Sequence, residues 1–190
     1  MGEISLIETA IHPVKEDEAS LIAKAQRDPA FFDAIYQRYL NPIYYYLLAR
    51  LHDPGEAEDL TAQVFLQALE DLPEYRPLRP FSAWLFTIAR HRAADHFRRR
   101  SDSPLNEELG QPADLPDPLA QVLQNERLAA LSRLLKRLDE EDLELLHLRF
   151  AAGLSFSEIA VLLGRKESAA KMALYRLLAR LESQLGKDDE

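Results

Sequence analysis

The 190-residue sequence contains no cysteine. This absence excludes a disulfide-stabilised fold, a thiolate–zinc site and a cysteine nucleophile, and it is typical of proteins in a reducing compartment. No stretch approaches the roughly 18 consecutive apolar residues of a membrane helix. Residues 1–20 also lack the basic start and apolar core of a secretory signal. The sequence therefore predicts a soluble, cytoplasmic protein with no membrane insertion of its own.

The sequence also lacks an excess of basic residues. Its 23 Lys and Arg stand against 32 Asp and Glu, and the net charge is −9. Nucleic-acid-binding domains usually carry a basic balance, so the total charge alone argues against a nucleic-acid partner. The hydrophobic fraction of 47% is ordinary for a globular protein and excludes wholesale disorder. The length predicts one domain or two small ones.

The charge is unevenly distributed along the chain. Residues 1–20 have a net charge of −4 and residues 101–126 a net charge of −6. In contrast, residues 76–100 hold seven arginines against one acidic residue, and residues 163–181 hold five basic residues against one. A single run of this kind is usually a solvated face. Two such runs, each at the end of a helical unit, favour two basic surfaces on an otherwise acidic protein.

A proline-rich segment divides the chain. Residues 101–118 hold four prolines, one glycine and five acidic residues, which favours an extended acidic linker. It separates residues 18–100, which follow an N-terminal arm at 1–17, from residues 119–190. Both long segments have apolar residues at helical spacing, and neither has the sustained alternation of a strand. The predicted fold class is all-α, with two helical domains joined by an acidic flexible linker.

In the first of these domains, prolines mark the expected breaks between helices. Pro42 is expected to interrupt an early helix, and a proline-framed loop at Glu74–Pro80 separates a helix over Glu56–Leu72 from one over Phe81–Arg100. Spacing predicts the buried face of the helix over Glu56–Leu72, which comprises Ala57, Leu60, Val64, Leu66 and Leu69. It predicts an outer face that comprises Asp59, Thr61, Gln63 and Gln67.

The second domain contains a helix-turn-helix pattern. Ser155 and Glu158 have the spacing of a capping box, which starts a short helix over Phe156–Leu163 that stops at Gly164. A longer helix over Ser168–Leu185 follows, and the small Ala160 suits the helix crossing. In this motif the second helix enters the major groove of DNA. Its predicted outward residues are Glu167, Ser168, Lys171, Met172, Tyr175 and Arg176.

Four stretches, in this order, resemble a known family. They are DPAFFDAIYQRYLNPIYYYLLARL, EAEDLTAQVFLQALEDL, FSAWLFTIARHRAADHFRRR and LHLRFAAGLSFSEIAVLLGRKESAAKMALYRLLARL. Residues 20–100 are similar to region 2, and residues 120–185 to region 4, of the extracytoplasmic-function (group IV) sigma factors of the sigma-70 family. The resemblance implies a transcription initiation factor that binds core RNA polymerase and promoter DNA. It implies an anti-sigma protein as regulator, and neither catalytic activity nor a cofactor.

The resemblance also implies three sets of site residues. The helix over Glu56–Leu72 would bind the polymerase clamp through Asp59, Gln63 and Phe65. The loop and helix over Tyr75–Arg100 would capture the −10 element as single-stranded DNA through Tyr75, Phe81, His91, Arg92, Asp95, Arg98 and Arg99. The helix over Ser168–Arg180, with a backbone contact from Arg149, would read the −35 duplex through Ser168, Lys171, Met172, Tyr175 and Arg176.

The chemistry of these residues suits the implied roles. An extruded base needs an aromatic surface, which Tyr75 and Phe81 can supply, and a displaced strand needs a cationic track. We expect His91 to contact a base, Asp95 to orient a neighbouring arginine, and Arg98–Arg100 to contact phosphates. In the −35 helix, Lys171 and Arg176 suit guanine edges or phosphates, and Met172 and Tyr175 suit the methyl group of thymine.

Two alternative functions remain open at this stage. His91, Asp95 and His96 could ligate a metal, but five residues separate the histidines, which places them about 140° apart around a helix. No HExxH, P-loop or GxSxG pattern is present. The other alternative is an autonomous transcription factor that uses only the helix-turn-helix. That hypothesis leaves the aromatic-rich first domain unexplained.

Overall fold

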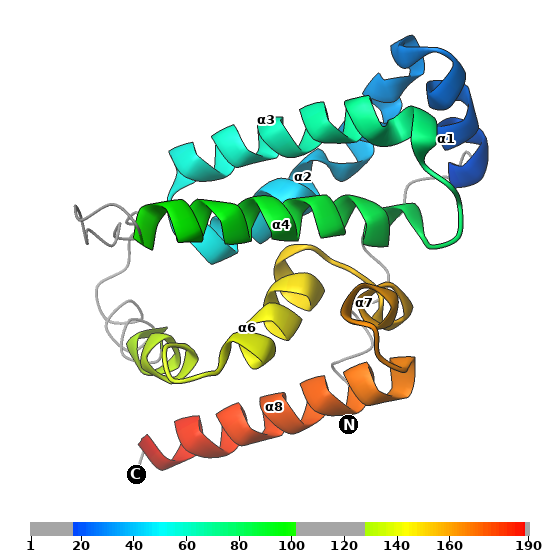
Figure 1. Cartoon of the computed structure of the whole chain (residues 1–190). Helices are drawn as coiled ribbons and strands as arrows, with labels where there is room; N and C mark the ends of the chain where they lie inside the picture. Colours follow the sequence, from blue (N-terminus) through cyan, green and yellow to red (C-terminus); the bar gives the residue numbers. More distant parts are fainter. Residues whose placement is uncertain (1–16, 102–127, 189–190) are drawn as a thin grey trace, which may run out of the picture.

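A computed structural model of the chain describes residues 17–101 and 128–188 (Figure 1). Within these ranges every regular element is a helix, which confirms the predicted all-α fold class. We call residues 17–101 the first unit and residues 128–188 the second unit. Residues 1–16 of the predicted arm and residues 102–118 of the predicted linker lie outside the described residues. In the described ranges, no helix is both long enough and apolar enough to cross a membrane.

The first unit consists of four α-helices and two short 3-10 turns. Proline and aspartate set two of its helix starts: Asp28 accepts from the backbone N of Ala30 at 2.9 Å, and Asp53 accepts from that of Glu56 at 2.9 Å. The α-helices are α1 (Glu18–Arg27), α2 (Phe32–Leu51), α3 (Pro54–Asp71) and α4 (Phe81–Ser101), and the turns are Pro29–Phe31 and Leu72–Glu74.

The expected break at Pro42 is wrong, because α2 continues through this residue. Proline inside a helix removes one backbone hydrogen bond and costs roughly 3 kcal/mol. The residues that follow it offset this cost, since Ile43, Tyr46 and Leu47 are completely buried. Tertiary packing therefore overrides the local preference of proline.

The phase of α3 differs from the predicted one. Its buried residues follow the sequence spacing of a single helical stripe: Ala57, Leu60, Thr61, Val64, Phe65 and Ala68. Leu66 lies one residue beyond this stripe and is 61% exposed, and Leu69 is also exposed, so the prediction that both point inward is wrong. Thr61, predicted to point outward, is buried. Its hydroxyl donates to the carbonyl of Ala57 at 2.7 Å, which satisfies the buried polar group.

The second unit begins with a helical segment over residues 128–135. The elements that follow it are α6 (Glu140–Leu146), a π-helical turn η4 (His147–Ala151), α7 (Phe156–Leu163) and α8 (Glu167–Asp188). The predicted capping box of α7 is confirmed: the Ser155 hydroxyl accepts from the Glu158 N–H, and the Glu158 carboxylate accepts from the Ser155 N–H at 2.8 Å. Gly164 ends α7 with φ of 65°, a conformation that favours glycine.

The two units pack against each other. α2 contacts η4 and α4 contacts α7, so that α6 and α7 lie between α4 and α8 (Figure 1). The buried apolar residues form one continuous cluster that includes Leu21 near the start of the first unit and Leu181 near the end of the second. The two predicted domains are therefore packed against each other around a shared apolar core.

His147 lies at this contact between the units. Burial is the main cause that lowers the pKa of its imidazole to about 4, and electrostatic interaction with Arg50 and His52 lowers it further. The imidazole is therefore neutral in the folded chain at pH 7. In the unfolded chain its pKa returns to about 6.5.

Lowering the pH from 7 to 5 is expected to destabilise the folded chain through His147. In this window the unfolded state binds a proton that the folded state does not, so the stability present above pH 6.5 is lost as the pH falls toward 4. Because the imidazole is partly accessible to water, we expect a loss of only about 1 kcal/mol. Urea unfolding at both pH values, compared between the wild type and His147→Gln, measures this loss. An identical pH dependence in both chains would contradict it.

Candidate functional site

The exposed face of α8 lies opposite its buried stripe. Ala170, Leu174, Leu177 and Leu181 are buried and hold α8 against the rest of the second unit. Since successive residues are about 100° apart on a helix, the intervening side chains point to solvent. All five predicted residues of α8 are exposed on this side: Ser168, Lys171, Met172, Tyr175 and Arg176.

An aromatic and cationic cluster joins this face to the residues before α7. The ring centroid of Phe156 lies 4.9 Å from the Arg149 guanidinium carbon and 5.9 Å from the Lys171 ammonium. The Lys171 ammonium is also 5.7 Å from the ring of Tyr175. Arg149 donates to the carbonyl of Leu154 at 2.9 Å, which fixes its position. The structure thus brings together Arg149, Lys171 and Tyr175, three of the residues predicted to contact the −35 element.

Phe156 was not among the predicted site residues. It is half-buried, and cation–π contacts of this kind orient charged groups at a surface. The signal that could have identified it is an aromatic residue directly after the capping serine, in the first turn of the first helix of the motif. Its ring holds the two cations of this cluster in place.

The basic end of α4 forms a second exposed surface. His91, Arg98 and Arg99 are exposed, and the Asp95 carboxylate accepts from Arg98 at 2.8 Å. Asp95 thus contacts the arginine three residues further along α4, and its role at the −10 element stays a prediction. Arg92 has a different contact, because its guanidinium donates to the side chain of Gln67 on α3 at 2.7 Å. In this conformation Arg92 therefore links α4 to α3.

Tyr75 and Phe81 do not form the predicted open aromatic surface. Phe81 is 1% exposed and Tyr75 is also buried, and their ring centroids lie 5.3 Å apart. Both rings pack on the half-buried Trp84, and the Tyr75 hydroxyl donates to the carbonyl of Arg79 at 2.8 Å. These rings form the buried side of the loop between α3 and α4. The prediction failed because both rings pack inward, against each other and against Trp84.

The most exposed large apolar residue of this loop is Leu78. It is 86% exposed and lies between Arg76 and Arg79, which are exposed as well. Leu78 was missed from sequence because a single leucine among prolines carries no periodic signal. It is the large apolar side chain that this loop exposes to solvent.

On α3, the predicted polymerase-binding residues are divided between two faces. Asp59 and Gln63 are exposed, as predicted. Phe65 is only 4% exposed and packs edge-on against Tyr36 at 4.7 Å between ring centroids, so its assignment to a contact surface is wrong. Leu66, one residue further along, is the apolar residue that accompanies Asp59 and Gln63 on the outer face.

The metal-binding alternative gains no support from the described part of the chain. In residues 17–101 and 128–188 no three His, Asp or Glu side chains form a group that could hold an ion. His96 points toward α3, where its Nε2 atom lies 3.2 Å from a carboxylate oxygen of Glu56, whereas His91 is exposed to solvent. The two histidines thus face different surroundings.

Comparisons with known proteins agree with this geometry. Residues 35–102 match the model of sigma-70 region 2, and residues 128–181 match that of sigma-70 region 4. The chain is 36% identical to the ECF RNA polymerase sigma factor BldN of Streptomyces coelicolor over 173 residues, which cover 88% of this chain and 66% of BldN. It is 37% identical to the ECF sigma factor ShbA of Streptomyces griseus over 141 residues, 68% of this chain and 74% of ShbA.

One solved structure with the same fold is that of CnrH in complex with the cytosolic domain of CnrY. The CnrH complex structure matches with a TM-score of 0.61 and 25% sequence identity, over 89% of this chain and 97% of the matched chain. The two family models match the first and the second unit, with region 2 before region 4, and the similarity to ShbA and to the CnrH structure agrees with this arrangement. The chain belongs to the extracytoplasmic-function sigma factors of the sigma-70 family, the non-catalytic RNA polymerase subunits that direct transcription initiation to promoters.

Proposed function

We propose that this chain binds core RNA polymerase through α3 and reads two promoter elements, the −10 element as a single strand and the −35 element as a duplex. The first unit, within residues 18–100, acts as region 2, and the second, within residues 119–190, acts as region 4, with 101–118 as their linker. The observation that carries the proposal is the capped helix-turn-helix whose second helix exposes a basic and aromatic face.

The −35 contact is assigned to α8. Its exposed side chains combine two cations with Met172 and Tyr175, which suits a major groove with guanine edges, phosphates and thymine methyl groups. Arg149 and Phe156 flank this surface from the preceding turn. Arg149 is placed to contact the DNA backbone, and Lys171 and Arg176 to read bases or phosphates.

The −10 contact is assigned to α4 and the loop before it. His91, Arg98 and Arg99 supply an exposed cationic track, with Asp95 orienting Arg98. The loop adds Leu78, an exposed apolar residue between two arginines that can pack against an extruded base. Tyr75 and Phe81 support this loop from its buried side.

The polymerase contact is assigned to the outer face of α3. Asp59, Gln63 and Leu66 are exposed on one side of this helix, and the large exposed area of Leu66 suits burial in a protein interface. Transcription requires the chain to meet polymerase and chromosomal DNA, so we place its action in the cytoplasm. The CnrH structure contains the cytosolic domain of CnrY. Because CnrH, which has the same fold, forms a complex with another protein, we propose a protein regulator, an anti-sigma factor, for this chain too.

DNA binding with and without polymerase tests the proposed function. Fluorescence anisotropy measures the affinity of the chain for a labelled promoter fragment, which is selected from random DNA by the reconstituted holoenzyme. We expect weak binding by the chain alone and a large gain when core polymerase is added. An autonomous regulator would bind duplex DNA equally well without polymerase, and that result would contradict the proposal.

A further inference from the structure

The loop between α3 and α4, residues 75–80, has few backbone donors of its own. It contains two prolines and follows a third at position 73, and proline has no N–H to donate. The backbone hydrogen bonds of the loop are short-range: Tyr75 donates to Leu72 at 3.1 Å, and Leu78 donates to Arg76 at 2.7 Å. Carbonyl groups of this segment therefore depend on side chains for further partners.

Gln26, near the end of α1, supplies such donors. Its side-chain amide donates to the carbonyl of Leu72 at 3.0 Å and to that of Tyr75 at 2.8 Å. Both bonds can form at once, because the amide nitrogen carries two hydrogen atoms. The first carbonyl lies at the end of α3, and the second lies in the first residue of the loop. One half-buried side chain thus connects α1 to both.

α1 is itself fixed to the rest of the first unit. Its apolar residues Leu21, Ile22 and Ala25 are buried. At its start, the Glu18 carboxylate accepts a hydrogen bond from the hydroxyl of Tyr39 on α2. α1 also contacts the turn at the end of α3, and it lies beside the connection from α3 to α4 (Figure 1). The amide that holds the loop therefore extends from an anchored helix.

A second side chain fixes the other end of the loop. The Tyr75 hydroxyl donates to the carbonyl of Arg79 at 2.8 Å, and its ring centroid lies 5.0 Å from that of Trp84. Gln26 thus fixes the backbone of Tyr75, whose side chain in turn fixes Arg79. The exposed Leu78 lies between these two fixed points. The conformation of the loop around Leu78 therefore depends on both contacts.

We propose that Gln26 is a positioning residue for the −10 element and acts through the loop between α3 and α4. Its two hydrogen bonds hold the loop in the conformation that presents Leu78 to an extruded base. This inference rests on the proposed function, which assigns the loop to the −10 contact. Without these bonds the loop samples other conformations, and the apparent affinity for the −10 strand falls with the fraction of molecules in the binding conformation.

Replacing Gln26 by methionine tests this role. Methionine is similar to glutamine in size and flexibility but has no donor, so Gln26→Met removes both hydrogen bonds and retains packing. Net contributions of two hydrogen bonds correspond to roughly a 10-fold change. We expect the variant bound to core polymerase to bind the single-stranded −10 element of the selected promoter about 10-fold more weakly. Its affinity for the −35 duplex should be unchanged, and fluorescence anisotropy measures both.

The fluorescence of Trp84 provides a readout that does not require DNA. Trp84 is the only tryptophan of the chain, and its ring packs on that of Tyr75. When Gln26 no longer holds the loop, we expect Tyr75 to move and water to reach the indole. The emission of the free, full-length Gln26→Met chain should therefore shift to longer wavelength. A role of Gln26 in global stability alone would leave the emission of the folded chain unchanged.

Variants at Gln37 provide matched controls. Gln37 is exposed on α2, so Gln37→Met makes the same substitution away from the loop and should keep the wild-type affinity and emission. Gln26→Glu places carboxylate oxygens against two carbonyl oxygens, so its loss of −10 affinity should exceed that of Gln26→Met. Gln37→Glu controls for the added charge. Circular dichroism verifies that each variant is folded.

The proposal requires both changes in a folded Gln26→Met chain. Wild-type −10 affinity, or wild-type emission of Trp84, would overturn it. An equal loss of −10 and −35 affinity would overturn it as well, because Gln26 would then not act on the loop alone. If the wild-type chain with core polymerase binds neither element, the proposed function fails. The emission of Trp84 still measures whether Gln26 holds the loop, so the two failures are distinguishable.

Discussion

Replacing both Lys171 and Arg176 by alanine is expected to reduce promoter-dependent transcription about 100-fold at a limiting concentration of the protein. A good contact from a basic side chain to a base edge contributes roughly 1–3 kcal/mol, and two losses near the lower part of this range multiply to about 100-fold. Both side chains are exposed on α8. Their removal should therefore leave the fold and the binding of polymerase unchanged.

A charge-matched variant separates this local effect from a change in net charge. Lys136 and Arg137 are also exposed in the second unit, but they lie beyond the helix-turn-helix. The variant Lys136→Ala/Arg137→Ala removes the same two charges and is expected to retain at least about half of the activity. Transcription assays at equal protein concentration compare the two. An equal loss in both variants would remove Lys171 and Arg176 from the −35 site.

Replacing Ile159 by alanine is expected to destabilise the folded chain by about 3 kcal/mol. Ile159 is completely buried on α7 and belongs to the apolar cluster that contains Ala160, Ala170 and Leu174. Truncating a buried isoleucine to alanine costs roughly 2–5 kcal/mol, since it removes apolar burial and leaves a cavity. Urea unfolding followed by circular dichroism measures this cost.

Val161→Ala provides the control for that experiment. Val161 is on the same helix but exposed, so its truncation should change the free energy of unfolding by less than about 0.5 kcal/mol. If Ile159→Ala were as stable as Val161→Ala, α7 would not be packed as described. In that case the position of α8 relative to the turn would have to be revised.

The helix-turn-helix was predictable from sequence because its boundaries depend on local chemistry. A capping serine with glutamate three residues later starts α7, and Gly164 ends it, so the predicted range and the observed range agree. The sequence range of α8 was predicted to start one residue late. The exposed face of α8 followed directly, because the buried stripe of leucines determines which side chains point to solvent.

The aromatic residues of the first unit were predicted less well. Tyr75, Phe81 and Phe65 suit either a binding surface or a core, and sequence alone does not distinguish the two. The structure buries all three. Conversely, Leu66 was predicted to be buried and Leu78 was not selected as a site residue. Both are exposed, Leu66 at the proposed polymerase surface and Leu78 at the proposed −10 surface. On α3, both Leu66 and Phe65 are apolar, so the sequence allowed two neighbouring stripes, and the structure buries the one that contains Phe65; Leu78 lies in a loop, where there is no periodicity to use.

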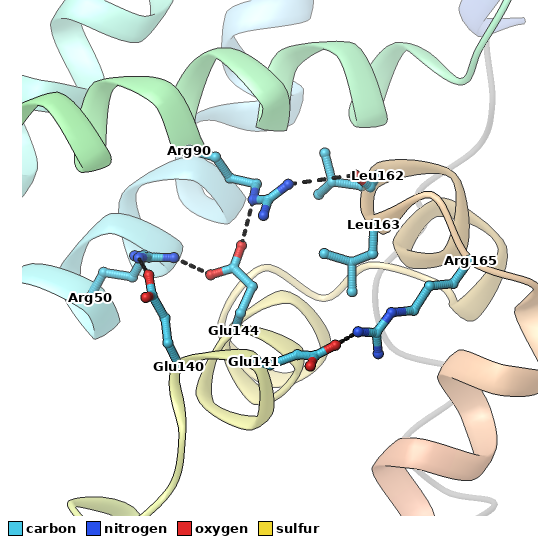
Figure 2. Close-up of a pocket in the computed structure, with 8 residues that line it drawn as sticks. All are labelled: Arg50, Arg90, Glu140, Glu141, Glu144, Leu162, Leu163 and Arg165. Carbon is cyan, nitrogen blue, oxygen red and sulfur yellow. Dashed lines mark hydrogen bonds and ion pairs between the residues drawn. The ribbon is translucent and has the colours of Figure 1, made fainter.

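The ion pair between Arg50 of the first unit and Glu144 of the second (Figure 2) could not be predicted from sequence at all. Arg50 and Glu144 are 94 residues apart, and nothing in the local pattern around either residue indicates its partner.

The net charge of −9 was misleading for a related reason, because it also ignores where residues lie in the fold. Acidic residues dominate residues 1–20 and 101–126, whereas the two surfaces proposed to bind DNA are locally basic. The charge of a binding surface depends on where the charged residues lie in the fold. The net charge of the whole chain carries no information about their positions.

Transcription of fragmented genomic DNA by core polymerase, with and without this protein, tests the central claim most directly. Sequencing of the 5′ ends identifies where transcripts begin. The account predicts new start sites that share a −10 and a −35 element, and it predicts that Lys171→Ala/Arg176→Ala loses them. Start sites identical to those of core polymerase alone would contradict the assignment of this chain as a promoter-directing subunit.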